Sequence, residues 1–134
     1  MNKLVYFLAL PLLSPISVQA QSSEERSISH FLSEYVSKIN KDVPRVLDHE
    51  TRLDGVFTTK NLLVYNYTLL NYISSQIDPS QLEPNIQKSV ISTLCNETKY
   101  DAMKEIGTEI IFRYHGKEGR FITELSQKMA NCDN

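Results

Sequence analysis

The chain has 134 residues and a formal net charge of −2, and its basic and acidic residues are mixed along its length. This length predicts one domain with a modest hydrophobic core. The absence of a basic patch argues against a nucleic acid partner, and no polybasic tract is present that would bind an anionic lipid surface.

Residues 1–20 have the pattern of a secretory signal peptide. Lys3 supplies the positive end, 4–13 is an interrupted apolar run, and Val-Gln-Ala at 18–20 places small residues where signal peptidase cleaves. The apolar run is shorter than the ~20 residues that span a bilayer, which disfavours the alternative of a retained anchor. We expect a mature domain at 21–134 without a membrane span, in the periplasm or secreted.

The first element of the mature chain is predicted to be a helix at 22–41. Ser22 and Glu25 have the spacing of a capping box at its start, and Pro44 ends the element. One apolar stripe recurs at helical period: Ile28, Phe31, Leu32, Tyr35, Val36 and Ile39. Such a stripe could bind a partner, but packing against the domain's own sheet is the favoured interpretation.

Two strands follow, at 50–59 and 62–70. In the second, Leu63, Tyr65, Tyr67 and Leu69 alternate with smaller or polar residues, as in a strand. The short polar link at 58–61 favours antiparallel pairing of the two strands.

The central segment is predicted to hold one or two helices. Asp78 can cap a helix that has Pro79 in its first turn and Gln81 as the capping-box partner. Because Pro84 interrupts the pattern, regular helix is expected to begin nearer that residue. Apolar residues then repeat every four positions, and a further helix at 97–106 ends at Gly107.

The last predicted motif is a hairpin. Strands at 109–115 and 120–126 flank a turn that contains two glycines, and Phe121, Thr123 and Leu125 are expected on one face. The order of elements indicates an α+β fold: a four-stranded, mainly antiparallel sheet of two hairpins, with the N-terminal helix and the central helices packed on one face.

Cys95 and Cys132 are the two cysteines of the chain. An exported protein with two cysteines usually pairs them, and neither has the CxxC or Cys/His neighbours of a metal or redox site. A bridge would close a loop of about 37 residues, for which the chain-entropy model gives about 4 kcal/mol of stabilisation. Free, metal-bound or catalytic thiols remain the alternatives.

No catalytic, cofactor or metal motif stands out. His30, His49 and His115 are far apart in sequence, and the chain has no GxSxG motif or phosphate-binding glycine loop. Carboxylates and arginines near the first strand could form an acid–base pair, but a salt-bridged strand edge is the simpler interpretation. We expect neither an enzyme nor a bound cofactor.

Two sets of residues resemble a group of small exported proteobacterial proteins that are mostly uncharacterised. In the first half these are Pro44, Asp48, Thr51-Arg52-Leu53-Asp54, Val56 and Tyr65-Asn66-Tyr67-Thr68-Leu69. In the second half they are Cys95, Gly107, Tyr114, Gly119, Ile122 and Cys132-Asp133. The chain departs from the pattern where Lys-Met-Ala-Asn replaces a proline that often precedes the final Cys-Asp. The resemblance implies an exported α+β domain and brings no activity.

The leading hypothesis is a non-enzymatic periplasmic or secreted protein that binds another envelope protein, as an assembly or accessory factor. The alternative is an inhibitor or immunity-type protein that blocks a cell-wall hydrolase or toxin. The candidate partner-binding residues lie in the last turn and on the first strand: Lys117, Glu118, Arg120, Thr51, Arg52 and Asp54.

Overall fold

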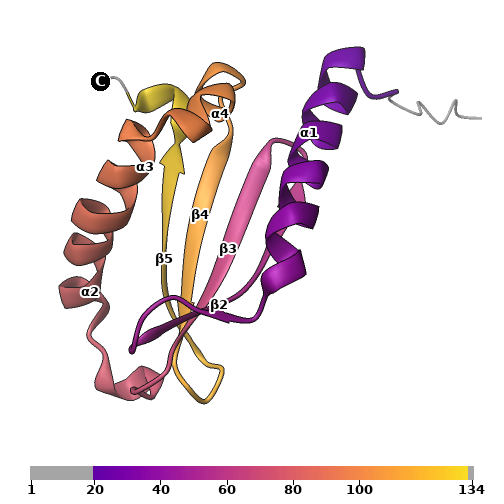
Figure 1. Ribbon diagram of the computed structural model, residues 1–134. Coiled ribbons are helices and arrows are strands. Elements are labelled where there is room, and N and C mark those ends of the chain that lie inside the picture. The colour runs from indigo at the N-terminus through magenta and orange to yellow at the C-terminus, as the bar shows by residue number, and fades with distance from the viewer. Residues whose placement is uncertain (1–19, 133–134) are drawn as a thin grey trace, which may run out of the picture.

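The computed structural model describes residues 20–132, so the predicted signal peptide lies almost entirely outside the described residues. A five-stranded sheet carries its helices on one face, and α1 lies apart from α2–α4 on that face (Figure 1). No helix of the described residues is long and apolar enough to cross a membrane.

The strands follow the chain order β1-β2-β3-β4-β5 across the sheet. Both predicted hairpins are present and antiparallel: β2 (Thr51–Thr59) with β3 (Leu62–Leu69), and β4 (Glu109–His115) with β5 (Phe121–Lys128). The fifth strand is β1 (Arg45–Val46), which pairs with β2.

The prediction of four strands was therefore wrong in number, and the sheet is mixed. The two-residue β1 is too short to show an alternating pattern in sequence. The hairpins meet through β3 and β4, which pair in parallel from Leu62 opposite Glu109 to Thr68 opposite His115. A parallel pair requires a long crossover, and the helical segment between these two strands provides it.

The helix α1 (Ser23–Ile39) confirms the predicted first helix and its cap. The Ser22 hydroxyl accepts from the Glu25 amide at 3.1 Å, and the Glu25 carboxylate accepts from the Ser22 amide at 3.0 Å. A 3-10 turn, Asn40–Asp42, follows directly. Of the apolar stripe, Leu32 is fully buried, which confirms packing on the domain itself.

The second helical segment begins earlier than predicted. The helix α2 (Pro79–Ile86) is capped by Asp78, whose carboxylate accepts from the Ser80 amide at 2.9 Å, and Pro84 lies within it. A five-residue π-helical turn, Gln87–Ile91, joins α2 to α3 (Ser92–Asn96). The proline is accommodated because a cap and the Pro79 first turn already fix the start of the helix.

A short helix, α4 (Asp101–Glu105), leads back to the sheet after a 3-10 turn at Thr98–Tyr100. Gly107 adopts φ +67° at its end, as predicted. Its amide donates to Lys104 and the Thr108 amide donates to Met103, which is the Schellman pattern of helix termination.

The register of β5 shifts once. Tyr114 and His115 follow each other on β4, but their partners on β5 are Thr123 and Phe121, so Ile122 is the extra residue of a bulge on β5. Phe121 thus lies on the opposite face from Thr123, because the bulge inserts a residue between them. The expectation that Phe121 shares a face with Thr123 and Leu125 was wrong, and Phe121 is 55% exposed.

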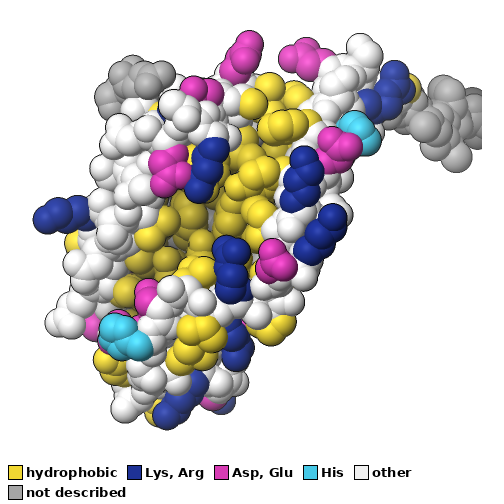
Figure 2. All heavy atoms as spheres, viewed as in Figure 1, with side chains coloured by type: hydrophobic (Ala, Val, Ile, Leu, Met, Phe, Trp, Pro, Cys, Tyr) yellow, Lys and Arg dark blue, Asp and Glu magenta, His cyan; other side chains and the backbone are white. Residues whose placement is uncertain are grey.

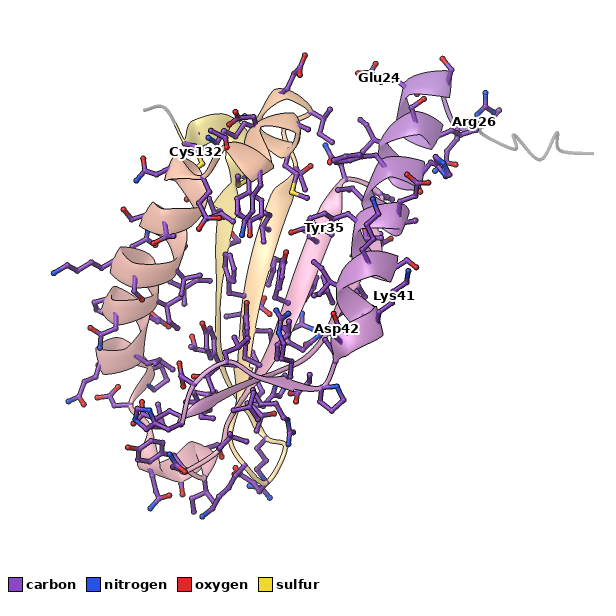
Figure 3. The ribbon with its side chains drawn as sticks, viewed as in Figure 1. Glu24, Arg26, Tyr35, Lys41, Asp42 and Cys132 are labelled. Atoms are coloured by element: carbon purple, nitrogen blue, oxygen red, sulfur yellow. A yellow bond between two sulfur atoms is a disulfide. The ribbon has the colours of Figure 1, made fainter. Side chains whose placement is uncertain are left out.

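The disulfide between Cys95 and Cys132 is present. It joins the end of α3 to the 3-10 turn Met129–Asn131 that follows β5 (Figure 3). The bridge therefore fixes the end of the crossover segment to the end of the last strand.

Candidate functional site

A groove runs between the two helical segments on the covered face of the sheet. Figure 2 shows hydrophobic side chains exposed along this line, between α1 on one side and α2–α4 on the other. We call the α1 side the first wall, the α2–α4 side the second wall, and the strands between them the floor. The groove is the candidate site because apolar surface of this kind is normally covered in a domain that acts alone.

Aromatic side chains of β3 and β4 form the floor. Tyr65 stacks on Phe112 with ring centroids 5.7 Å apart, and Tyr67 stacks on Tyr114 at 5.0 Å. The parallel register places each pair side by side on neighbouring strands. Tyr65 and Tyr67 also stack on each other at 6.2 Å, so the floor is a continuous aromatic surface.

The groove holds two pockets. The first has a volume of about 180 Å³ and opens over the floor, against the second wall. It is lined by Tyr65, Tyr67, Ser89, Val90, Thr93, Leu94, Glu97, Tyr100 and Phe112. The second has a volume of about 200 Å³ and lies between α1 and α4, where Phe31 and Ile106 face it. The pocket between α1 and α4 is almost wholly apolar, whereas the pocket over the floor combines aromatic rings with the polar side chains of Ser89, Thr93 and Glu97. Apolar surface with a few polar groups is typical of a binding cleft.

Two contacts hold the first wall to the sheet. The hydroxyls of Tyr35 on α1 and Tyr65 on β3 are hydrogen-bonded at 2.8 Å, and Tyr35 points from its helix toward the sheet (Figure 3). Beyond the end of α1, the Asn40 carboxamide donates to the Val56 carbonyl at 2.7 Å and accepts from the Val56 amide at 2.9 Å. These bonds fix the width of the groove on this side.

The second wall is held at both ends. Near its start, the Thr123 hydroxyl of β5 donates to the Glu83 carboxylate of α2 at 2.6 Å. At its far end, the disulfide ties Cys95 to Cys132. Between these points Ile86, Ile91 and Leu94 are buried against the sheet. The side of the helix that carries Ser89, Val90 and Thr93 is thereby left facing the groove.

Burial shifts the acid–base behaviour of the floor. Loss of solvent raises the pKa of Tyr65 and of Tyr67 well above the ordinary range, and neighbouring tyrosines raise both further. Burial likewise raises the pKa of Tyr100 and of Tyr114 to about 12. These hydroxyls therefore stay protonated at neutral pH and act as hydrogen-bond donors and acceptors inside an apolar surface.

The predicted residues of the first strand do not join the groove. Arg52 and Asp54 form an ion pair at 2.6 Å, and the Thr68 hydroxyl donates to the same carboxylate. Arg52 pairs with Thr68 across the strands, one position away from the pairing of Leu53 with Tyr67, so it lies on the uncovered face. Thr51 pairs with Leu69 at the end of the strand. Neither of the two pockets of the groove is lined by any of these three residues.

The turn of the last hairpin is held against a neighbouring segment. The Lys117 amide donates to the Tyr72 carbonyl at 2.8 Å, and the Glu118 carboxylate accepts from the Ser74 amide at 2.8 Å. Hydrogen bonds from the side chain and the backbone amide of Ser74 lower the pKa of Glu118. The side chains of Lys117 and Arg120 remain exposed. Within residues 20–132, no group of His, Cys, Asp and Glu side chains is arranged to hold a metal ion.

Sequence analysis found the components of the groove but not the groove itself. The alternating tyrosines of β3 were recognised as a strand, and the apolar repeat that includes Val90 and Leu94 was recognised as part of the helical segment. Tyr100 carried no signal, because it lies in a short irregular turn. Only the mixed topology brings these segments together.

No protein-family model matches the sequence, and no curated protein matches it. Solved structures do resemble the fold. A secreted protein of Pseudomonas aeruginosa superposes with a TM-score of 0.68 and 15% identity, over 84% of this chain and 99% of that one. The pilotin EpsS of the Vibrio vulnificus type 2 secretion system superposes with a TM-score of 0.65 and 14% identity, over 81% of this chain and 94% of that one.

The type II secretion system pilotin AspS of Vibrio cholerae gives a TM-score of 0.62 and 8% identity, over 80% of this chain and 94% of that one. At these identities the likeness concerns the fold. The α+β arrangement of this chain is thus shared with two secretion pilotins and with a secreted protein.

Proposed function

We propose that the protein is a non-enzymatic accessory factor of the cell envelope that binds a segment of another envelope protein in the groove between α1 and α2–α4. The bound segment is an amphipathic helix whose apolar stripe lies on the aromatic floor. The observation that carries this proposal is the groove on the covered face of the sheet, where hydrophobic side chains reach the surface between the two helical walls and two pockets open.

The geometry supports a helix as the bound element. An amphipathic helix buries a narrow apolar stripe, and the aromatic floor together with the apolar pocket between α1 and α4 matches that stripe. Tyr65, Tyr67 and Tyr100 combine a large apolar ring with a hydroxyl, a combination that is enriched in protein interfaces. The shared fold of two type II secretion pilotins supports an accessory role in the envelope.

Site-specific photo-cross-linking tests the proposal. A photoreactive phenylalanine analogue replaces Thr93, which is exposed and lines the groove, in the exported protein within intact cells. The matched control carries the analogue at Lys88, which is exposed on the same helical segment and lines neither groove pocket. We expect one discrete envelope-protein adduct at Thr93 and none at Lys88.

Mass spectrometry of the adduct then maps the cross-linked peptide. A peptide with apolar residues at helical period supports the proposal. Equal adducts from both positions, or an adduct that forms at Lys88 but not at Thr93, would show that the groove is not the binding surface.

A further inference from the structure

One corner of the groove already holds a cation. The Lys99 ammonium lies 2.7 Å from a carboxylate oxygen of Glu97 and 5.0 Å from the centroid of the Tyr100 ring. Glu97 and Tyr100 both line the pocket over the floor, whereas Lys99 does not. A carboxylate beside the face of an aromatic ring is a favourable environment for an ammonium or a guanidinium group.

Lys99 is held there weakly. Its side chain is 63% exposed, and the Glu97 side chain is 38% exposed. Exposed ion pairs of this kind contribute little to stability, because water screens the charges and the long side chains lose conformational freedom. The hydrogen bond to Glu97 raises the pKa of Lys99, so the ammonium is charged at neutral pH. A second cation can therefore replace it at small cost.

Glu97 is also the one charged residue among those that line this pocket. A partner helix whose apolar stripe covers the floor would bring its flanking residues to the pocket rim, where Glu97 lies. Acidic residues beside the stripe would be repelled by the Glu97 carboxylate. Uncharged residues there would leave the ion pair of Glu97 with Lys99 intact. Basic residues there would pair with the carboxylate.

We infer that Glu97 and Tyr100 form a cation-binding corner that selects a partner helix with an arginine or lysine beside its apolar stripe, and that Lys99 occupies this corner until the partner displaces it. The inference rests on the proposed function of the groove. Arginine is the better ligand, because its planar guanidinium can stack on the ring while it pairs with the carboxylate.

Two fluorescent peptides test the inference. Both are amphipathic helices with the same leucine stripe, about 18 residues long, because shorter isolated helices are marginal in water. One carries arginine at the positions that flank the stripe, and the other carries glutamine. Fluorescence anisotropy at low salt measures the affinity of each for the mature protein and for three variants.

Glu97→Gln and Lys99→Met are expected to change the affinity for the arginine peptide in opposite directions. The wild type should bind the arginine peptide about fivefold more tightly than the glutamine peptide. Glu97→Gln should remove this preference, whereas Lys99→Met should strengthen binding of the arginine peptide alone, because it removes the competing ammonium. Glu34→Gln, on the exposed side of α1 with its side chain 61% exposed, is the matched control and should change neither affinity.

The outcomes separate this inference from the proposed function. Equal binding of both peptides would support the groove and overturn the cation-binding corner. A preference for arginine that survives Glu97→Gln, or weaker binding in Lys99→Met, would also overturn the corner. Failure of both peptides to bind would overturn the corner and the helix-binding groove together.

Discussion

Asn40 makes the two hydrogen bonds to β2 that a neighbouring strand would make. Its carboxamide pairs with both the amide and the carbonyl of Val56, on the edge of β2 beyond the two-residue β1. The bonds close part of an exposed sheet edge and fix the end of α1. This contact could not be predicted from the sequence, because it depends on where the end of a helix meets the edge of a strand.

Replacing Asn40 with alanine should lower the free energy of unfolding by about 1–3 kcal/mol, because it leaves two partly buried backbone groups of Val56 without partners. Urea denaturation measures the change. Lys41→Ala is the control, since Lys41 is exposed and forms no ion pair within residues 20–132. Equal stabilities of the two variants would contradict this role of Asn40.

Buried tyrosines of the floor and of the second wall make the stability of the fold decrease at alkaline pH. Burial raises the pKa of Tyr100 and Tyr114 to about 12 in the folded protein, against 10.0 for an unperturbed tyrosine. Between these values the unfolded chain binds fewer protons than the folded one, so stability falls as pH rises. Below pH 10 this contribution to stability is fully present.

We therefore expect the near-ultraviolet absorbance of tyrosinate to rise in two steps. Exposed tyrosines ionise first, and the floor tyrosines ionise together with the loss of tertiary structure seen by circular dichroism. A single reversible step near pH 10 in the folded protein would contradict the burial of the floor.

Among the elements, those defined by local chemistry could be predicted from sequence. The capping box of α1, the Asp78 cap, the glycine after α4 and both hairpins rest on interactions within a few residues. The parallel pairing of β3 with β4 could not be predicted, because the sequence specifies each hairpin but not which strands meet. The start of α2 was placed too late, because Pro84 was given more weight than the cap.

The disulfide connects two elements, because it ties α3 to the turn that follows β5. Replacing Cys95 with serine should lower the free energy of unfolding by about 2–5 kcal/mol, as for native bridges in small exported domains. Denaturation of the wild type with and without a reductant, beside Cys95→Ser, measures the change. In Cys95→Ser the reductant should have no further effect.

Loss of the bridge should also loosen the second wall more than the first. Hydrogen exchange is expected to accelerate in Ser92–Asn96 of α3 while Ser23–Ile39 of α1 is little changed. Uniform acceleration across both segments would show that the bridge does not act on the wall in particular.

In the whole molecule, the helices cover one face of the sheet and leave the other face uncovered. The covered face holds the groove, and the other face carries the ion pair of Arg52 with Asp54 and that of Arg113 with Glu124. The helices lie on one face of the sheet, as predicted, whereas the predicted partner-binding residues lie outside the groove. The groove is formed by a helix, two strands and the crossover segment together, so no sequence pattern within any one of these segments predicts it.

The central claim is that this groove binds a helix, and amide NMR of an isotopically labelled protein that comprises residues 21–134 tests it most directly. Titration with the glutamine-flanked leucine peptide should shift resonances of Val90, Leu94 and Tyr100 on the second wall and of Ile28 on the first. Absence of shifts would contradict the claim, as would shifts confined to the uncovered face around Phe57, which is 43% exposed there.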